Sequence, residues 1–229
     1  MTQSRKPIIG VLGGLGPETT AEFYEELIAS THGQTRPAVC IWSLPIDRRK
    51  EAMFIASGKH GDHFRTLMVD GTKRLVSAGA TIIVIPCNTV HEFFDEVSAG
   101  VSVPFTNMID LVAKEVAQRQ WKHALLLATS RTIQTRLFQR SIPTTKTELR
   151  LPSPSDQQTL DRTIQGLLKN DRDTSHKQFL LHLMAQAKTE RVILGCTDLQ
   201  LLWTAKDSVI DSMHLLAQDT ARLASTETI

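Results

Sequence analysis

One stretch decides the fold of this chain of 229 residues, IIVIPCNT at residues 82–89. Its first four residues are aliphatic, and a proline, a cysteine and two small polar residues follow them. An apolar run of this length, with no alternation, is typical of a strand buried on both faces of a parallel sheet. Residues 64–78 precede it with apolar side chains at helical spacing, as expected for a helix that covers such a sheet.

The first half of the chain alternates short apolar runs with helical periodicity. Strands are predicted at 7–12, 38–42 and 81–85, and helices at 18–30, 64–78 and from 89 to 97. Strands that alternate with helices pair in parallel through βαβ crossovers, so the predicted class is α/β. Polar segments containing Gly or Pro, at 57–63 and 144–158, are predicted to be loops.

The second half repeats this plan, with a strand predicted at 124–128 and a helix at 133–140. RVILGCTD at 191–198 matches IIVIPCNT, and residues 127–129 match 12–14 more weakly. Chance similarity between apolar strands would explain the weaker match. A cysteine beside small polar residues at both strand ends favours duplicated halves.

We therefore expect two similar α/β domains with parallel sheets, related by a pseudo-two-fold axis, with the active site in the cleft between them. The first domain would comprise residues 1–105 and a C-terminal helix at about 210–229, and the second residues 106–209. In open parallel sheets, ligands bind outside the carboxyl ends of the strands. The cysteines at those ends are therefore candidate site residues.

Composition excludes several classes of protein. Hydrophobic residues make up 41% and charged residues 22%, which is ordinary for a globular protein and not for a disordered chain. No apolar run approaches the roughly 18 residues of a membrane span, and 26 Lys and Arg against 24 Asp and Glu, spread along the chain, give no footprint for nucleic acid. Three cysteines without a CxxC pair favour a reducing compartment over a disulfide framework or structural zinc. Residues 1–7 lead directly into a strand, so we expect no signal peptide and a cytoplasmic protein without membrane or nucleic-acid partners.

A glycine-rich turn, GGLGP at 13–17, joins the first strand to the first helix. It lacks the lysine of a phosphate-binding Walker loop, and Thr19 stands where the dinucleotide fingerprint needs glycine. Backbone N–H groups at a helix start suit an anionic group such as a carboxylate, which makes Gly14 and Leu15 candidate substrate-binding residues. A tight strand-to-helix connection without a ligand is the alternative.

Cys87 and Cys196 carry the sharper hypothesis. Each ends a strand and precedes a predicted helix start, where N–H groups and the helix dipole stabilise a thiolate. Two such groups on opposite faces of one carbon could remove a proton from one side and deliver another from the other side. Packing as inert core thiols is the alternative for either residue.

Three motifs resemble the aspartate/glutamate racemase superfamily, in its cofactor-independent aspartate racemase branch. They are IIGVLGGLGPETT at 8–20, PCNTVH at 86–91 and GCTDLQLL at 195–202. The matches span nearly the whole chain, and the pair of cysteine motifs is specific. The resemblance implies racemisation of an acidic amino acid, aspartate ahead of glutamate, with no cofactor and no metal. It also implies that Cys87 and Cys196 are the two acid/base residues and that the protein is a homodimer.

The resemblance further implies a set of substrate-binding residues. Arg48, after Pro-Ile-Asp, and Lys169 would bind the two carboxylates, although solvated surface charges are the alternative for both. Four residues are implied to line the pocket: Asn88, Thr89, Thr129 and Thr197.

Three positions depart from the family pattern and bear on substrate choice more than on reaction type. Leu15 stands where methionine is more usual, Asp198 where glutamate is commoner, and Gln165 where some aspartate racemases have tyrosine. Alternatives on the same scaffold are an isomerase of maleate-like diacids, a hydantoin racemase and a non-catalytic binding protein. In the maleate case one cysteine would act as a nucleophile.

The histidines are open to simpler interpretations. His91, one turn beyond Cys87, would support the cleft or make a local hydrogen bond on its helix. His60 and His63 have a spacing close to that of metal ligands, but no third ligand is evident, which favours a solvated loop.

Overall fold

The computed structural model describes residues 7–31, 36–143, 145–203 and 208–225. The expectation for a signal peptide concerns residues 1–7, of which residues 1–6 lie outside the described residues. Two compact units emerge. Unit 1 comprises Met1–Asp47, His60–Met108 and Met213–Ile229, and unit 2 comprises Arg48–Lys59 and Ile109–Ser212. Within the described ranges, no helix combines the length and apolar character that crossing a membrane requires.

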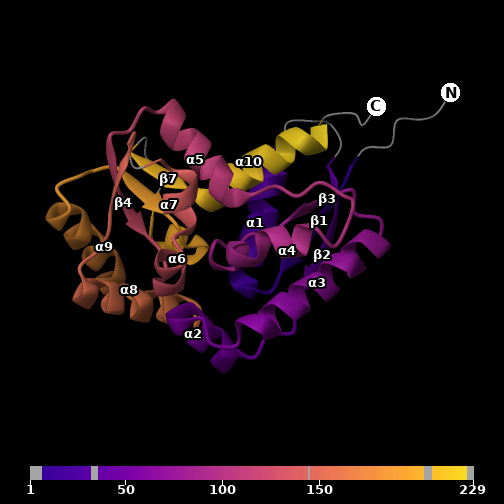
Figure 1. Cartoon of the computed structure of the whole chain (residues 1–229), viewed down its shortest axis with the longest axis horizontal. Coiled ribbons are helices and arrows are strands. Elements are labelled where there is room, and N and C mark those ends of the chain that lie inside the picture. Colours follow the sequence, from indigo (N-terminus) through magenta and orange to yellow (C-terminus); the bar gives the residue numbers. More distant parts are fainter. Residues whose placement is uncertain (1–6, 32–35, 144, 204–207, 226–229) are drawn as a thin grey trace. The chain divides into compact units, whose positions relative to one another are not determined.

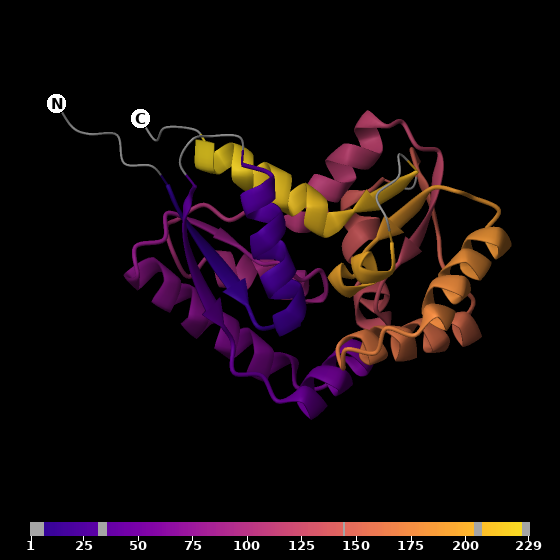
Figure 2. The same cartoon turned by 180° about the vertical axis from the view of Figure 1, so that it is seen from behind.

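Unit 1 is built on a parallel sheet of three strands in the order β2-β1-β3. The bridge between Ile83 of β3 and Phe105 extends this sheet by one further residue pair. Helix α10 lies beside α1 in both Figure 1 and Figure 2, where the His214 ring contacts the Glu26 carboxylate. The elements are β1 (Ile8–Gly13), α1 (Pro17–Ala29), β2 (Ala38–Ser43), α3 (Gly61–Ser77), β3 (Ile82–Val84), η1 (Thr89–Phe93), α4 (Phe94–Ser98) and α10 (Ser212–Ser225).

Unit 2 is built on a parallel sheet of four strands in the order β5-β4-β6-β7. Leucine and valine side chains of β4, β6, α8 and α9 form one buried cluster on this sheet. The elements are α2 (Arg48–Ser57), α5 (Met108–Gln118), β4 (His123–Leu127), α6 (Ser130–Gln134), α7 (Leu137–Ser141), β5 (Glu148–Arg150), α8 (Pro154–Leu167), α9 (Thr174–Gln186), β6 (Val192–Leu194), η2 (Thr197–Leu202) and β7 (Val209–Asp211).

The two sheets have the same strand order, and the predicted α/β class is confirmed. β2-β1-β3 followed by Phe105 corresponds to β5-β4-β6-β7. The chain enters each sheet at an inner strand, moves to one neighbour and then crosses to the other side. The connection to the first neighbour and the connection that crosses to the other side run in opposite directions along the sheet. Because both are right-handed, their helices lie on opposite faces, so both faces of each sheet are covered. The core positions predicted at helical spacing, Phe64, Met68 and Leu75, are buried in α3.

The prediction of one continuous helix at 133–140 is wrong. The chain forms two short helices instead, α6 and α7, and Arg136 between them has a φ of 55°. A residue other than glycine in this left-handed region ends a helix, and the apolar spacing of the sequence does not reveal it.

The two predicted loops are also wrong in part. Of residues 57–63, α2 reaches Ser57 and α3 begins at Gly61. Of residues 144–158, where Thr144 lies outside the described residues, three form β5 and five begin α8. β5 exists because β4 pairs with it, and α8 begins where the Ser153 hydroxyl caps it and proline occupies its first turn.

Candidate active site

The Cys87 loop follows β3 at the carboxyl end of the unit 1 sheet. The N–H of Cys87 donates to the carbonyl oxygen of Ile85 over 2.9 Å, which turns the chain sharply after the strand. The thiol-bearing residue is half-buried, whereas Asn88 and Thr89 beside it are buried. The segment that follows is η1, a 3₁₀ helix of five residues, rather than the α-helix expected from residue 89 onward. The helix-dipole argument for this thiol is correspondingly weak.

His91 holds the loop from within η1. Its Nδ1 lies 2.7 Å from the carbonyl oxygen of Cys87, and its Nε2 accepts the N–H of Met108 over 3.2 Å. Because a backbone N–H can only donate, Nε2 must carry the lone pair, so Nδ1 bears the proton and donates to Cys87. The ring is 4% exposed and stacks on Phe94 with centroids 5.5 Å apart.

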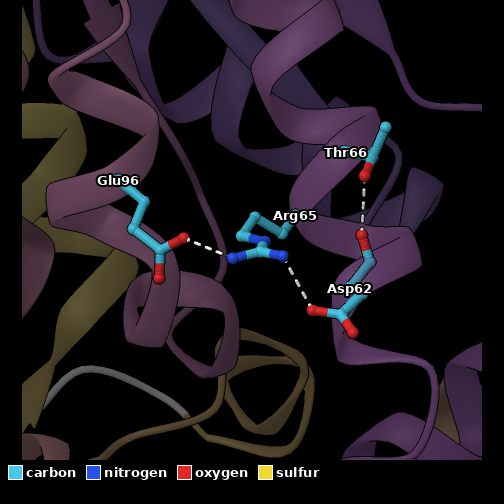
Figure 3. Close-up of polar contacts among 4 residues, drawn as sticks. All are labelled: Asp62, Arg65, Thr66 and Glu96. Carbon is cyan, nitrogen blue, oxygen red and sulfur yellow. Dashed lines mark hydrogen bonds and ion pairs between the residues drawn. The ribbon is translucent and has the colours of Figure 1, made fainter.

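An exposed ion-pair cluster ties α4, which follows η1, to α3. The Arg65 guanidinium donates to Glu96 and to Asp62, each over 2.8 Å, as Figure 3 shows. The hydrogen bond and charge of Glu96 raise the pKa of Arg65 above its ordinary value. The cluster connects α3 to α4 on the surface of unit 1.

The Cys196 loop follows β6 in unit 2 at the corresponding place. A Cβ added to Gly195 would lie 2.8 Å from a methyl group of Leu126 and 2.9 Å from the Phe138 ring, so the chain passes here where a larger residue has no room. Cys196 is 6% exposed, and its Sγ–H donates to Asp198 Oδ2 over 3.5 Å. Thr197 is buried beside it and begins η2, again a 3₁₀ helix where an α-helix was expected.

The turn after β4 carries Thr129, whose hydroxyl accepts the N–H of Thr132 and caps α6. Helix α8 clamps this turn. Asp161 accepts the N–H of Ser130 over 2.9 Å and its hydroxyl over 2.5 Å, and Gln157 donates to the carbonyl oxygen of Ala128 over 2.9 Å. Sequence reasoning missed this clamp, because it joins residues about 30 positions apart; the spacing of Gln157 and Asp161 on one helix face was the available signal.

The glycine turn after β1 is packed from both sides. Gly14 has a φ of 88°, and a Cβ there would lie 2.5 Å from the backbone nitrogen of Leu44. Its N–H donates to the Thr20 hydroxyl over 3.0 Å. Gly14 therefore fits the tight strand-to-helix connection better than it fits a direct carboxylate ligand.

The register of each sheet brings the candidate residues of one unit to the same edge. Val11 pairs with Val84, so the glycine turn and Cys87 follow neighbouring strands of unit 1. Leu127 pairs with Leu194, so Thr129 and Cys196 follow neighbouring strands of unit 2, each two residues beyond the paired leucines.

The two candidate carboxylate ligands belong to unit 2. Arg48 is the first residue of α2 and Lys169 follows the end of α8, and both are exposed. Helix α2 groups with unit 2 although the residues before and after it belong to unit 1. Among the described residues, no group of three or more His, Cys, Asp or Glu side chains could hold a metal ion.

Comparisons with known proteins show which family this chain resembles. The sequence model of the Asp/Glu/hydantoin racemase family matches residues 12–220. The broad-specificity amino-acid racemase RacX of Bacillus subtilis strain 168 is 26% identical over 93% of this chain and 96% of its own length. An aspartate racemase homologue from Pyrococcus horikoshii OT3 superposes with a TM-score of 0.76 at 27% identity, covering 97% of this chain and all of its own. The aspartate racemase of Picrophilus torridus shares the fold, with a TM-score of 0.78 at 23% identity, covering 96% of this chain and all of its own.

The resemblance that the three motifs indicated is therefore confirmed at the level of family and reaction class. A match over residues 12–220 takes in both cysteine loops and every strand except the first four residues of β1. The chain belongs to the Asp/Glu/hydantoin racemase family, in its class of cofactor-independent amino-acid racemases.

Proposed function

We propose that this protein racemises an acidic amino acid, aspartate ahead of glutamate, by a two-base mechanism that uses Cys87 and Cys196. One observation carries the proposal. Two sheets with the same strand order each place a cysteine just beyond the carboxyl end of the corresponding strand, beside buried Asn or Thr side chains. In the proposed site these thiols approach the α-carbon from opposite faces.

The proposed reaction moves one proton on each side of the substrate. The thiolate of one cysteine removes the α-proton, and the resulting carbanion takes a proton from the thiol of the other cysteine, which becomes the thiolate. The enzyme ready to react holds one thiolate and one thiol, because two thiolates repel and two thiols lack a base. The hydrogen bond from Cys196 to Asp198 supports Cys196 as the protonated partner at rest, since a carboxylate only accepts.

Arg48 and Lys169 are proposed to bind the two substrate carboxylates. Thr129 and Thr197, together with Asn88 and Thr89, are proposed to line the pocket, and Gly14 and Leu15 to shape its wall. Arginine suits a carboxylate because two of its N–H groups can donate in parallel to the two oxygens, and lysine supplies a point charge. We also propose that the protein is a homodimer, and a single monomeric species in light scattering would contradict that assignment.

Single replacements of the two cysteines test the mechanism. Cys87→Ser and Cys196→Ser should each abolish racemisation, because serine holds its proton far more tightly than cysteine. Each variant should still exchange the α-hydrogen of one enantiomer with solvent deuterium, and the two variants should favour opposite enantiomers. Racemisation by either variant at nearly the wild-type rate, or exchange of the same enantiomer by both, would contradict two-base catalysis.

The substrate is tested on a panel of amino acids, diacids and hydantoins without pyridoxal phosphate. Turnover of aspartate and glutamate with little activity on neutral amino acids supports the proposal. Comparable turnover of neutral amino acids would favour the broad specificity named for RacX. Three other outcomes would contradict the proposed function. Diacid isomerisation would indicate a diacid isomerase, hydantoin turnover a hydantoin racemase, and binding without turnover a non-catalytic binding protein.

A further inference from the structure

Each cysteine loop, or the end of the strand just before it, is tied by one buried side chain to the first residue of a helix that continues into the other unit. In unit 1, His91 joins the carbonyl oxygen of Cys87 to the N–H of Met108. Met108 begins α5, and from Ile109 onward the chain belongs to unit 2. In unit 2, the Ser212 hydroxyl donates to the carbonyl oxygen of Leu194 over 2.8 Å, two residues before Cys196.

The second tie has the same placement in the chain as the first. Ser212 begins α10, and from Met213 onward the chain belongs to unit 1. In each unit, the last position in the strand order is followed by a helix, and the tie lies at the start of that helix. This position is Phe105 in unit 1 and β7 in unit 2. The helices are anchored in the units that they enter. In α5, Asp110 accepts the Ser141 hydroxyl of α7, and in α10, His214 contacts Glu26 of α1.

Both ties are buried inside their units and do not lie on the surface. Ser212 is 0% exposed and His91 nearly so, and the His91 ring is held on the Phe94 ring. A buried hydrogen bond is costly to leave unmade, so each tie favours one position of its loop. The imidazole uses both nitrogens, one to donate and one to accept, which is what a bridge between a carbonyl oxygen and an N–H requires.

We propose that His91 and Ser212 are positioning residues, each of which fixes one cysteine loop against the start of the helix that leaves its unit. The inference rests on the proposed two-thiol function and adds how the thiols are held. Neither residue transfers a proton to the substrate. Each determines where its cysteine lies, and the geometry of the α-proton transfer depends on that position.

Site-selective alkylation of the full-length protein tests the two ties separately. Iodoacetamide at about pH 9, where thiols are largely ionised, reports access to each thiol, with Cys40 of β2 as the internal reference. His91→Phe keeps a ring to stack on Phe94 but removes both hydrogen bonds, and Ser212→Ala removes one hydroxyl. Thr220→Val is the matched control, because it deletes a buried bond of α10, from the Thr220 hydroxyl to Leu216, that does not reach a cysteine loop.

His91→Phe should raise the alkylation rate of Cys87 by about threefold or more through local opening and leave Cys196 unchanged. Ser212→Ala should do the reverse, and Thr220→Val should change neither rate. The proposal would be overturned if the alkylation rates were the same in all variants, or if the rates of Cys87 and Cys196 rose together in either variant. If circular dichroism shows that His91→Phe does not fold, His91→Asn, whose amide reaches only one of the two partners, replaces it under the same expectations.

Kinetics give the second readout. His91→Phe and Ser212→Ala should each have a kcat about tenfold to a hundredfold below that of the wild type. KM for the substrate should change less than about twofold, because the proposed carboxylate ligands are untouched. His91→Gln, whose amide offers a donor and an acceptor, should recover most of kcat. A loss shared equally by His91→Gln and His91→Phe would overturn the bridging role. Absence of turnover in the wild type would contradict the proposed function alone, since the alkylation pattern does not need a substrate.

Discussion

At the scale of the residue, the two cysteines have different surroundings although their loops correspond. Cys196 is buried and donates its S–H to Asp198, whereas Cys87 is half-buried and has its carbonyl oxygen held by His91. A negative charge close to a thiol disfavours a second negative charge on the sulfur. In the proposed mechanism, Asp198 therefore favours Cys196 as the thiol that keeps its proton when no substrate is bound.

Asp198→Asn removes that charge while keeping the size of the side chain. We expect the pH of half-maximal Cys196 alkylation to fall, because the neutral amide no longer opposes the thiolate. Peptide mass spectrometry of samples alkylated over a pH series measures the shift. Cys87 serves as the control within each sample, and an unchanged Cys196 profile would show that Asp198 does not act on the thiol.

Gly195 determines how closely the Cys196 loop approaches β4 and α7 of unit 2. Gly195→Ala places a methyl group against Leu126 and Phe138, and such overpacking costs about 1–3 kcal/mol of unfolding free energy. Urea unfolding measures this loss. Gly100→Ala is the matched control, because its nearest neighbour would be the Val97 carbonyl oxygen at 3.4 Å, and its effect should stay within about 0.5 kcal/mol.

At the scale of the element, α9 begins with a titrating cap. The N–H of Ser175 donates to Asp173 over 2.7 Å, and this hydrogen bond lowers the pKa of the carboxyl below its ordinary value. A carboxyl whose pKa is lower in the folded state stabilises the fold at neutral pH. That contribution is lost as the pH falls through the lowered pKa.

Asp173→Ala should therefore reduce the urea midpoint at neutral pH, and the difference from wild type should shrink as the solution is acidified. Asp173→Asn keeps an accepting oxygen at the cap but does not titrate, so its difference from Asp173→Ala should not depend on pH over the same range. Urea titrations at a series of pH values below neutrality provide the measurement. A wild-type advantage that grows on acidification would contradict the assignment.

The elements that the sequence predicted well are those with strong local signals. The apolar run at 82–85 and its counterpart at 192–194 contain the largely buried strands β3 and β6, and the spacing of Phe64 and Met68 placed α3 correctly. β5 was missed because it is three residues long and exists through its pairing with β4. The 3₁₀ helices after the cysteines were missed because hydrophobic spacing over five or six residues does not distinguish them from α-helices.

The candidate site was predictable as a set of residue types and not as a set of contacts. Cys87 and Cys196 stand out from the repeated motif, but the bond from Cys196 to Asp198 needs the curvature of η2. The clamp on Ser130 by Asp161 needs α8 to be packed against the turn after β4. Such partners depend on tertiary packing, which composition and spacing do not contain.

At the scale of the whole molecule, α2 groups with unit 2, so both proposed carboxylate ligands belong to the same unit. Arg48 and Lys169 both belong to unit 2 together with Cys196, whereas Cys87 belongs to unit 1. If both basic side chains hold carboxylates, unit 2 supplies the charge that binds a diacid. The proposed mechanism would take its other thiol, Cys87, from unit 1.

Arg48→Met and Lys169→Met should raise KM for an acidic amino acid by about tenfold or more, since each removes a charged hydrogen bond, and should affect a monocarboxylic substrate far less. Steady-state kinetics on both substrate types give the comparison. Arg49→Met, next to Arg48 on the exposed surface of α2, is the control and should leave both KM values unchanged. Equal effects of Arg48→Met on the two substrate types would remove Arg48 from the site.

The placement of α10 has a consequence for synthesis on the ribosome. Unit 1 contains β1 and β2, which are made before any part of unit 2, yet it also contains residues 213–225, which are made after Ser212, the last residue of unit 2. Unit 2 has all of its described elements once Ser212 has emerged, so it can fold while the chain is still growing. The unit whose first strand is made earlier is therefore completed later, and until α10 is made, α1 lacks the helix that lies beside it.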